Sequence, residues 1–233
     1  MIATVNTLGQ PIGNPLPHWK APAFPPHRSM TGRFCRLEPL DAHRHGGHLW
    51  VANAQDLDDS NWTYLPYGPF AGIDDYQQWL ETSAASKDPQ FYAIIDLATE
   101  KAVGVASYLR IEPAQGCIEV GHLSFSPLLQ GKTAATEAMY LMMANAFTLG
   151  YRRYEWKCDA LNAPSRRAAL RLGFSFEGIF RQAVITKGRN RDTAWFSVID
   201  REWPECQKAF KRWLDPRNFD AQGVQRQSLA ALR

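Results

Sequence analysis

The 233-residue sequence has few cysteines, little net charge and no long apolar run. The four cysteines, Cys35, Cys117, Cys158 and Cys206, are far apart, which argues against a disulfide framework or a zinc site. The formal charge of +3 is too small to predict binding to nucleic acid or to an anionic membrane. No window reaches the length of a membrane-spanning helix, and the first residues do not resemble a signal peptide. We therefore expect a cytoplasmic protein.

The composition is that of a folded globular protein. Hydrophobic residues make up 45% and charged residues 21%, and the length favours one domain. The one metal-like cluster is His43, His45 and His48. The intervening Gly46 and Gly47 weaken the helix that would have to align such ligands. We expect no metal site.

Proline is concentrated at the start of the chain. Residues 1–30 carry six prolines, which interrupt regular hydrogen bonding and favour extended chain. Domain-like patterning begins at Arg33. We predict an N-terminal arm over 1–32, one domain over 33–203, and a C-terminal helix with a polar tail over 204–233.

Strand and helix patterns alternate through this domain. The predicted elements are a strand near 34–40, helices after Asp41 and after Asp74, strands at 91–97, 101–111, 117–125 and 153–159, helices at 133–150 and 163–172, and a hairpin of 174–187 and 192–200 around Gly188–Asn190. The aromatic loop at 61–70 either closes over a pocket or only packs beneath the surface.

The stretch from Ser124 to Ala138 joins a strand to a helix through small residues. Free N–H groups and the dipole at a helix start favour phosphate, so this turn predicts a pyrophosphate site. The end of the turn, 131–133, also matches the end of a nucleotide-binding P-loop. The first glycine of that motif is replaced by Ser126, and Pro127 restricts the loop further. Nucleotide hydrolysis is therefore the less favoured interpretation.

Four sequence blocks, in this order, make the chain resemble GNAT acetyltransferases, especially ribosomal-protein N-terminal acetyltransferases and their small-molecule relatives. The blocks are IEVGHLSFSP at 118–127, the stretch 130–138, DALNAPS at 159–165 and LGFSFEG at 172–178. The resemblance implies an α/β fold of the α+β type, with helices flanking a mixed sheet of about seven strands that splays between its fourth and fifth strands. It also implies acetyl-CoA as co-substrate and a primary amine, on a protein N-terminus or a small molecule, as acceptor.

The same resemblance assigns the coenzyme site. Backbone at Leu123, Ser124 and Phe125 would bind pantetheine, and Asn162 and Ser165 match the family's N-x-x-S. The pyrophosphate positions would be Gln130, Gly131, Lys132, Thr133, Ala134, Ala135 and Thr136. Thr133 departs from the pattern, because the family usually has glycine there.

Direct transfer needs a base for the amine and an acid for the departing thiolate. Glu119 is the first candidate base and Asp159 the second, although the first can be a structural carboxylate and the second can simply turn the strand. Ser165 is the candidate acid or water holder, and a helix cap would explain it equally well.

Several features leave alternatives open. Thr133 and the lack of an obvious base keep a non-catalytic acyl-CoA-binding module as the alternative function. The basic turn 187–191 can contact a coenzyme phosphate or an acidic acceptor, or simply be solvated. Trp62 and Trp195 can line the acceptor pocket or be ordinary buried aromatics. A homodimer through sheet edges or through the arm is compatible with the sequence.

Overall fold

The structure is a computed structural model that describes residues 4–233. The strands are β1 (Thr4–Val5), β2 (Pro11–Ile12), β3 (Met30–Thr31), β4 (Cys35–Pro39), β5 (Gln90–Asp96), β6 (Lys101–Glu112), β7 (Cys117–Phe125), β8 (Arg153–Asp159), β9 (Ser175–Thr186) and β10 (Arg189–Ile199). The helices are α1 (Ala42–Asn53), α2 (Ile73–Ala85), α3 (Thr133–Thr148), α4 (Ala163–Leu172) and α5 (Trp203–Leu214), with 3-10 turns at Ser60–Trp62, Pro216–Asn218 and Ala230–Leu232.

Strands β3 to β10 form one mixed sheet, in the order β3-β4-β5-β6-β7-β8-β10-β9. Neighbouring strands are antiparallel except for β7 and β8, which are parallel. The fold class predicted from the sequence is confirmed. The sheet has eight strands where about seven were expected, because the short β3 pairs with the outer edge of β4.

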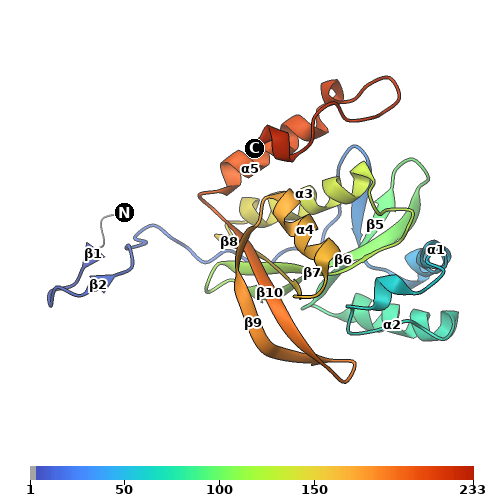
Figure 1. The fold of residues 1–233 in the computed structure, drawn as a ribbon, viewed down its shortest axis with the longest axis horizontal. Coiled ribbons are helices and arrows are strands. Elements are labelled where there is room, and N and C mark those ends of the chain that lie inside the picture. Colours follow the sequence, from blue (N-terminus) through green and yellow to red (C-terminus); the bar gives the residue numbers. More distant parts are fainter. Residues whose placement is uncertain (1–3) are drawn as a thin grey trace.

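Helices cover both faces of this sheet (Figure 1). Helices α1 and α2 lie over β5 and β6 on one face, here called the α1/α2 face, while α3 and α5 pack together on the other, the α3 face. Each layer has its own apolar cluster. One contains Leu49, Leu80 and Ile95 beneath α1 and α2, and the other contains Met142 and Phe210 from α3 and α5.

Local signals explain where the helices begin and end. The carboxylate of Asp41 accepts hydrogen bonds from the N–H groups of His43 and Arg44, both at 3.0 Å, which confirms Asp41 as the N-cap of α1. At the other end of the domain, α4 stops at Gly173, whose φ of 101° is a conformation that glycine adopts without strain.

The last hairpin turns earlier than predicted. The turn residues are Lys187 and Gly188, both with positive φ, and Arg189 and Asn190 already pair in β10. A two-residue turn with positive φ at both positions matches the twist of the strands. The predicted hairpin is present, and its second strand begins at Arg189 where 192 was expected.

Of the chain before β3, the part nearest to β3 contacts the domain. Figure 1 shows β1 and β2 standing away from the sheet. Closer to the domain, the Ala23 carbonyl accepts from Tyr151 (3.2 Å) and the Pro25 carbonyl accepts from Gln90 (3.0 Å). The predicted arm also includes residues 1–3, which lie outside the described residues.

No helix within residues 4–233 is long and apolar enough to cross a membrane. Over the same residues, no group of three or more His, Cys, Asp or Glu side chains is placed to hold a metal ion. His45 instead lies 3.3 Å from the buried carboxylate of Glu38.

Candidate active site

Strands β7 and β8 pair at one end only. Their parallel pairing joins residues 117–120 to residues 153–156, and no further pair between them is recorded in the described chain. The rest of β7, from Gly121 to Phe125, pairs with β6 along one edge and leaves the edge towards β8 open. The splay predicted between these strands is therefore present. Free backbone groups along such an edge need another partner, so the gap suits an extended ligand.

A bulge deforms β7 where the gap opens. Ser107 pairs with Gly121 and Val105 with Ser124, so β7 has one residue more than β6 in this interval. His122 lies in the bulge with φ of 49°. Its ring packs against Tyr67 and Phe91, at centroid distances of 5.6 and 5.1 Å. The bulge therefore directs the imidazole to the α1/α2 face.

The loop after β7 leads directly into α3. Gly131 turns the chain with φ of 69°, and Lys132 has the extended backbone of an N-cap residue. No side chain among the described residues caps this helix start. The first N–H groups of a helix have no carbonyl partner within it, and the helix dipole adds positive potential there. The predicted pyrophosphate residues thus have the geometry that binds phosphate.

Thr133 is the first residue of α3 and is not among the residues with positive φ. Its backbone therefore does not require glycine. Its Oγ1 accepts a hydrogen bond from Gln225 Nε2 at 3.2 Å, which brings the C-terminal segment to the phosphate loop. Threonine in place of the usual glycine therefore adds a side chain beside the loop but does not strain the backbone.

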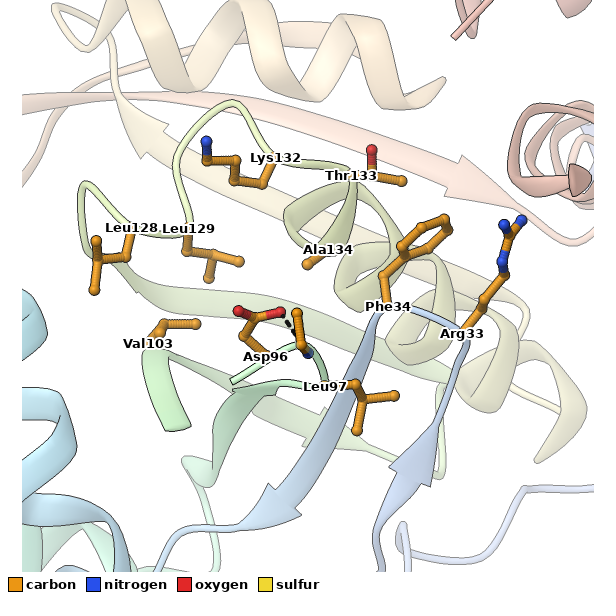
Figure 2. A pocket seen from close by; sticks show the side chains of 11 residues that line it. Arg33, Phe34, Asp96, Leu97, Val103, Leu128, Leu129, Lys132, Thr133 and Ala134 are labelled. Atoms are coloured by element: carbon orange, nitrogen blue, oxygen red, sulfur yellow. Dashed lines mark hydrogen bonds between the residues drawn. The ribbon is translucent and has the colours of Figure 1, made fainter. Parts of the chain in front are cut away.

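A cavity of about 390 Å³ flanks the same loop. Figure 2 shows Lys132, Thr133 and Ala134 on one side of it, with Phe34 and Asp96 from the β4 and β5 region on the other. The open edge of β7 faces β8, which is the opposite direction in the sheet. The cavity therefore borders the residues predicted to bind pyrophosphate and does not contain the splay.

The turn after β8 supplies the next group of predicted residues. Asn162 caps α4 by accepting from the N–H of Ser165 at 3.0 Å, and Asp159 accepts from the N–H of Leu161 at 2.8 Å. The hydroxyl oxygen of Ser165 accepts a hydrogen bond from Trp156 Nε1 at 3.0 Å. Asn162 and Asp159 thus have the structural roles weighed for them, whereas the Ser165 hydroxyl interacts with two β8 side chains, Trp156 and Cys158.

Glu119 is buried and paired with two cations. Its carboxylate lies 2.7 Å from Arg110 Nη1 and 2.9 Å from Lys157 Nζ, and Lys157 also contacts Glu155 at 2.8 Å. Burial raises the pKa of Glu119, and Lys157 and Arg110 oppose this increase. The ammonium of Lys157 lies 3.7 Å from the ring centroid of Trp195. The charges form a compact network beside the splay.

Comparison with known proteins places this geometry in a family. Residues 37–175, more than half of the chain, match the model described as an acetyltransferase (GNAT) domain. The chain belongs to the GNAT acetyltransferase family. The splayed strands and the uncapped α3 start lie within the matched residues.

Three relatives of this GNAT chain span different shares of it. A crystal structure of a GCN5-related N-acetyltransferase from Brucella melitensis is 46% identical with a TM-score of 0.91, and the match covers 93% of this chain and 99% of that one. An uncharacterized N-acetyltransferase, p20, of Bacillus licheniformis is 28% identical over 60% of this chain and 80% of its own length. The Escherichia coli ribosomal-protein-serine acetyltransferase is 33% identical over 44% of this chain and 58% of its own length.

The aromatic loop around Trp62 extends from the α1/α2 face to the turn before α4 and to the β9–β10 hairpin. Tyr64 Oη donates to the carbonyl of Leu161 at 3.3 Å, and Lys187 Nζ donates to the carbonyl of Trp62 at 2.7 Å. The loop is thereby joined to the turn before α4 and to the β9–β10 hairpin. It also packs into the apolar cluster beneath α1 and α2, which is the second of the two interpretations considered for it. Closure over a pocket stays a prediction.

Several residues of this site were missed by the sequence analysis. Tyr67 and His122 meet across the loop and the β7 bulge, while Arg110 and Lys157 come from the strands on either side of Glu119. The glycine at position 121, within the predicted strand 117–125, was the one available signal for a bulge.

Proposed function

We propose that the chain transfers the acetyl group of acetyl-CoA directly to a primary amine, carried by a protein N-terminus or by a small molecule. The observation that carries this proposal is the open edge of β7, which begins at Gly121 and is joined by the loop 126–132 to the uncapped start of α3. A long ligand with a pyrophosphate at one end and an extended arm at the other fits both features.

Acetyl-CoA would supply an activated thioester, and the chain would hold and orient it. The backbone at Leu123 and Ser124 would pair with the pantetheine arm, since the carbonyl of Phe125 already accepts from Gln130 Nε2 at 2.8 Å. The N–H groups at the start of α3 and the ammonium of Lys132 would bind the pyrophosphate.

We assign proton transfer as follows. Ser165 would protonate the departing thiolate, because Trp156 and Cys158 on β8 hold its hydroxyl beside the splay. Glu119 and Asp159 remain candidate bases. The two cations bound to Glu119 favour its charged form and hold the carboxylate in place. A carboxylate fixed in this way is better suited to orienting a water molecule than to contacting the acceptor amine directly.

Calorimetric titration with acetyl-CoA tests the binding half of the proposal, and release of free thiol across a panel of amines tests catalysis. Lys132→Ala should weaken acetyl-CoA binding about three- to tenfold, because it removes one positive charge at the helix start. Lys87→Ala, at an exposed position just after α2, is the matched control and should bind normally.

Each result has a clear meaning. Absence of binding would overturn the whole proposal. Binding without thiol release from any amine would favour the alternative function, an acyl-CoA-binding module without catalysis.

A further inference from the structure

Unpaired polar atoms gather on the α1/α2 face of the splay. Among residues 4–233, five buried side-chain polar atoms lack a hydrogen-bond partner, and four of them belong to Tyr67, His122, Arg191 and Thr193. Buried polar groups are nearly always paired, so a group of exceptions in one region indicates a place for a polar ligand.

Two of these residues meet at the β7 bulge. The rings of Tyr67 and His122 stack with an interplanar angle of 8°, and both Tyr67 Oη and His122 Nδ1 are left without a partner. With Nε2 carrying the proton, Nδ1 is an acceptor. This acceptor is three residues beyond Glu119, where β7 has already separated from β8.

The other two residues approach from β10. Thr193 pairs with Asp159 at the end of β8, and Arg191 lies two residues earlier on the same strand, so the two side chains share a face. The hairpin that carries them is fixed to the aromatic loop by Lys187. The positive charge of Arg191 is one of the causes that lower the pKa of His122.

Arg191 differs from the other cations at this site. Arg110 and Lys157 both pair with Glu119, whereas none of the ion pairs recorded within the described residues includes Arg191. Its Nε is buried and unpartnered. A guanidinium in such surroundings is best satisfied by an anion that arrives with a ligand, because its donors form a fork that matches carboxylate and phosphate.

We propose that the acceptor is a small amine that carries a carboxylate or phosphate group, that Arg191 binds this anion, and that His122 Nδ1 accepts a proton from the amine. This inference rests on the proposed acetyl transfer and names its substrate class.

The step balances in atoms and protons. The acceptor ammonium gives one proton to His122 Nδ1, and the neutral nitrogen then forms a bond to the thioester carbonyl carbon. The carbon–sulfur bond breaks, and the thiolate takes up one proton from Ser165 or water. The nitrogen gives its second proton to that same Ser165 or water, which restores the donor. The products are an amide, free CoA thiol and the proton that His122 returns to solvent.

The charges around His122 link anion binding to this proton transfer. Burial, followed by the charges of Arg110 on β6 and Arg191 on β10, lowers the pKa of His122 to about 4, while Tyr67 and Phe91 cover the ring. The imidazole is therefore neutral and able to accept a proton at pH 7. An anion bound to Arg191 would offset one positive charge and make the imidazole a stronger base.

The first measurement uses matched acceptors. Glycine and β-alanine are compared with their amides, ethanolamine phosphate with ethanolamine, and a short peptide with an amidated C-terminus stands for a protein N-terminus. Thiol release by the wild-type chain should favour the anionic member of each pair. Comparing the carboxylate and phosphate arms identifies the source of the anion. Faster turnover of the neutral amines or the peptide would overturn the inference and leave acetyl transfer intact.

The second measurement uses variants. Arg191→Gln should reduce the preference for anionic over neutral acceptors about 30-fold or more, while the Kd for acetyl-CoA stays within about twofold. Arg189→Gln, exposed on the same strand, is the control and should keep the preference. If Arg191→Gln mainly weakens acetyl-CoA binding, the guanidinium holds the coenzyme, and the assignment fails.

His122→Asn separates proton transfer from binding. Asparagine tolerates the positive φ of the bulge, so the backbone should be preserved. We expect kcat to fall about 100-fold with acceptor KM changed less than about threefold. An unchanged kcat would remove His122 from the reaction.

A binding experiment tests the anion site separately from acetyl transfer. Calorimetric titration of the CoA-saturated protein with β-alanine should show binding that Arg191→Gln abolishes and Arg189→Gln preserves. Binding with this pattern but no thiol release would support the anion site and contradict acetyl transfer. No binding would contradict the anion site whatever the outcome of the thiol assay.

Discussion

The charge network beside the splay provides a sharp test of the structure. Lys157 is 7% exposed and bridges the carboxylates of Glu119 and Glu155, with side-chain exposures of 4% and 12%. Lys157→Met replaces the ammonium with an apolar group of similar length. The variant leaves two buried carboxylates, each with one arginine instead of an arginine and a lysine.

The expected loss of stability can be estimated from this geometry. Removing one partner of a buried ion pair costs about 3–5 kcal/mol, and the lower end applies because Arg110 and Arg153 remain. The contact between Lys157 and the Trp195 ring contributes up to about 2 kcal/mol more when it is lost. For a chain of this size, a loss of about 3 kcal/mol lowers Tm by roughly 6–12 °C.

The loss of stability in Lys157→Met should depend on pH. Burial raises the folded-state pKa of Glu119 above its ordinary value of 4.5, and removing Lys157 should raise it further. A carboxyl with a raised folded pKa contributes stability below its unfolded pKa, and this contribution is lost as pH rises through the folded value. The free energy of unfolding lost in Lys157→Met should therefore be small near pH 4.5 and increase towards neutral pH.

Urea unfolding of the wild type and variants at several pH values measures these effects. Lys208→Met, on the exposed side of α5, is the control and should change the free energy of unfolding by less than about 0.5 kcal/mol. Adding Glu119→Gln to Lys157→Met should recover part of the loss, since the two positions are coupled. A loss below about 1 kcal/mol, or one independent of pH, would refute the network as described.

Three further variants test other parts of the site. Ser165→Ala should lower kcat about 10- to 100-fold with the acetyl-CoA Kd nearly unchanged, and equal turnover would reduce Ser165 to part of the α4 cap. Thr133→Gly should tighten acetyl-CoA binding in calorimetry if the side chain crowds the phosphate, and weaker binding would contradict this. Glu137→Gln should cost about 2–4 kcal/mol in urea unfolding, because the buried carboxylate accepts three N–H groups before and at the start of β4, at 2.8, 2.6 and 2.9 Å. A loss near zero would show that those groups find other partners.

The sequence predicted what depends on neighbours along the chain. Asp41 could be read as a helix cap because its partners are two and three residues away. The loop from Gln130 to Thr136 could be read as a phosphate site because both the turn and the helix start are local. The four ordered blocks then indicated the family, and with it the splay between β7 and β8.

The partners of Glu119 lie on neighbouring strands, and their identity depends on register. Arg110 reaches Glu119 from β6 across an irregular part of the pairing, and Lys157 is on β8, two residues beyond the position that pairs with Glu119. A shift of one residue would turn either side chain to the other face. Composition and local pattern do not determine that register. In the sequence Glu119 therefore had no visible partner, and we interpreted it as a candidate base.

The position of His122 also depends on strand register, so the sequence did not predict it. Alternation along β7 places Gly121 on the face of Glu119 and would turn His122 towards the α3 core. The bulge reverses this, because one additional residue between Gly121 and Ser124 brings the imidazole onto the α1/α2 face, opposite Tyr67. The bulge lies where the edge of β7 becomes free, so under our proposal one segment of β7 both binds the coenzyme and presents His122 to the acceptor. A variant that removes the bulge should weaken coenzyme binding and acceptor use together, whereas His122→Asn should affect only the latter.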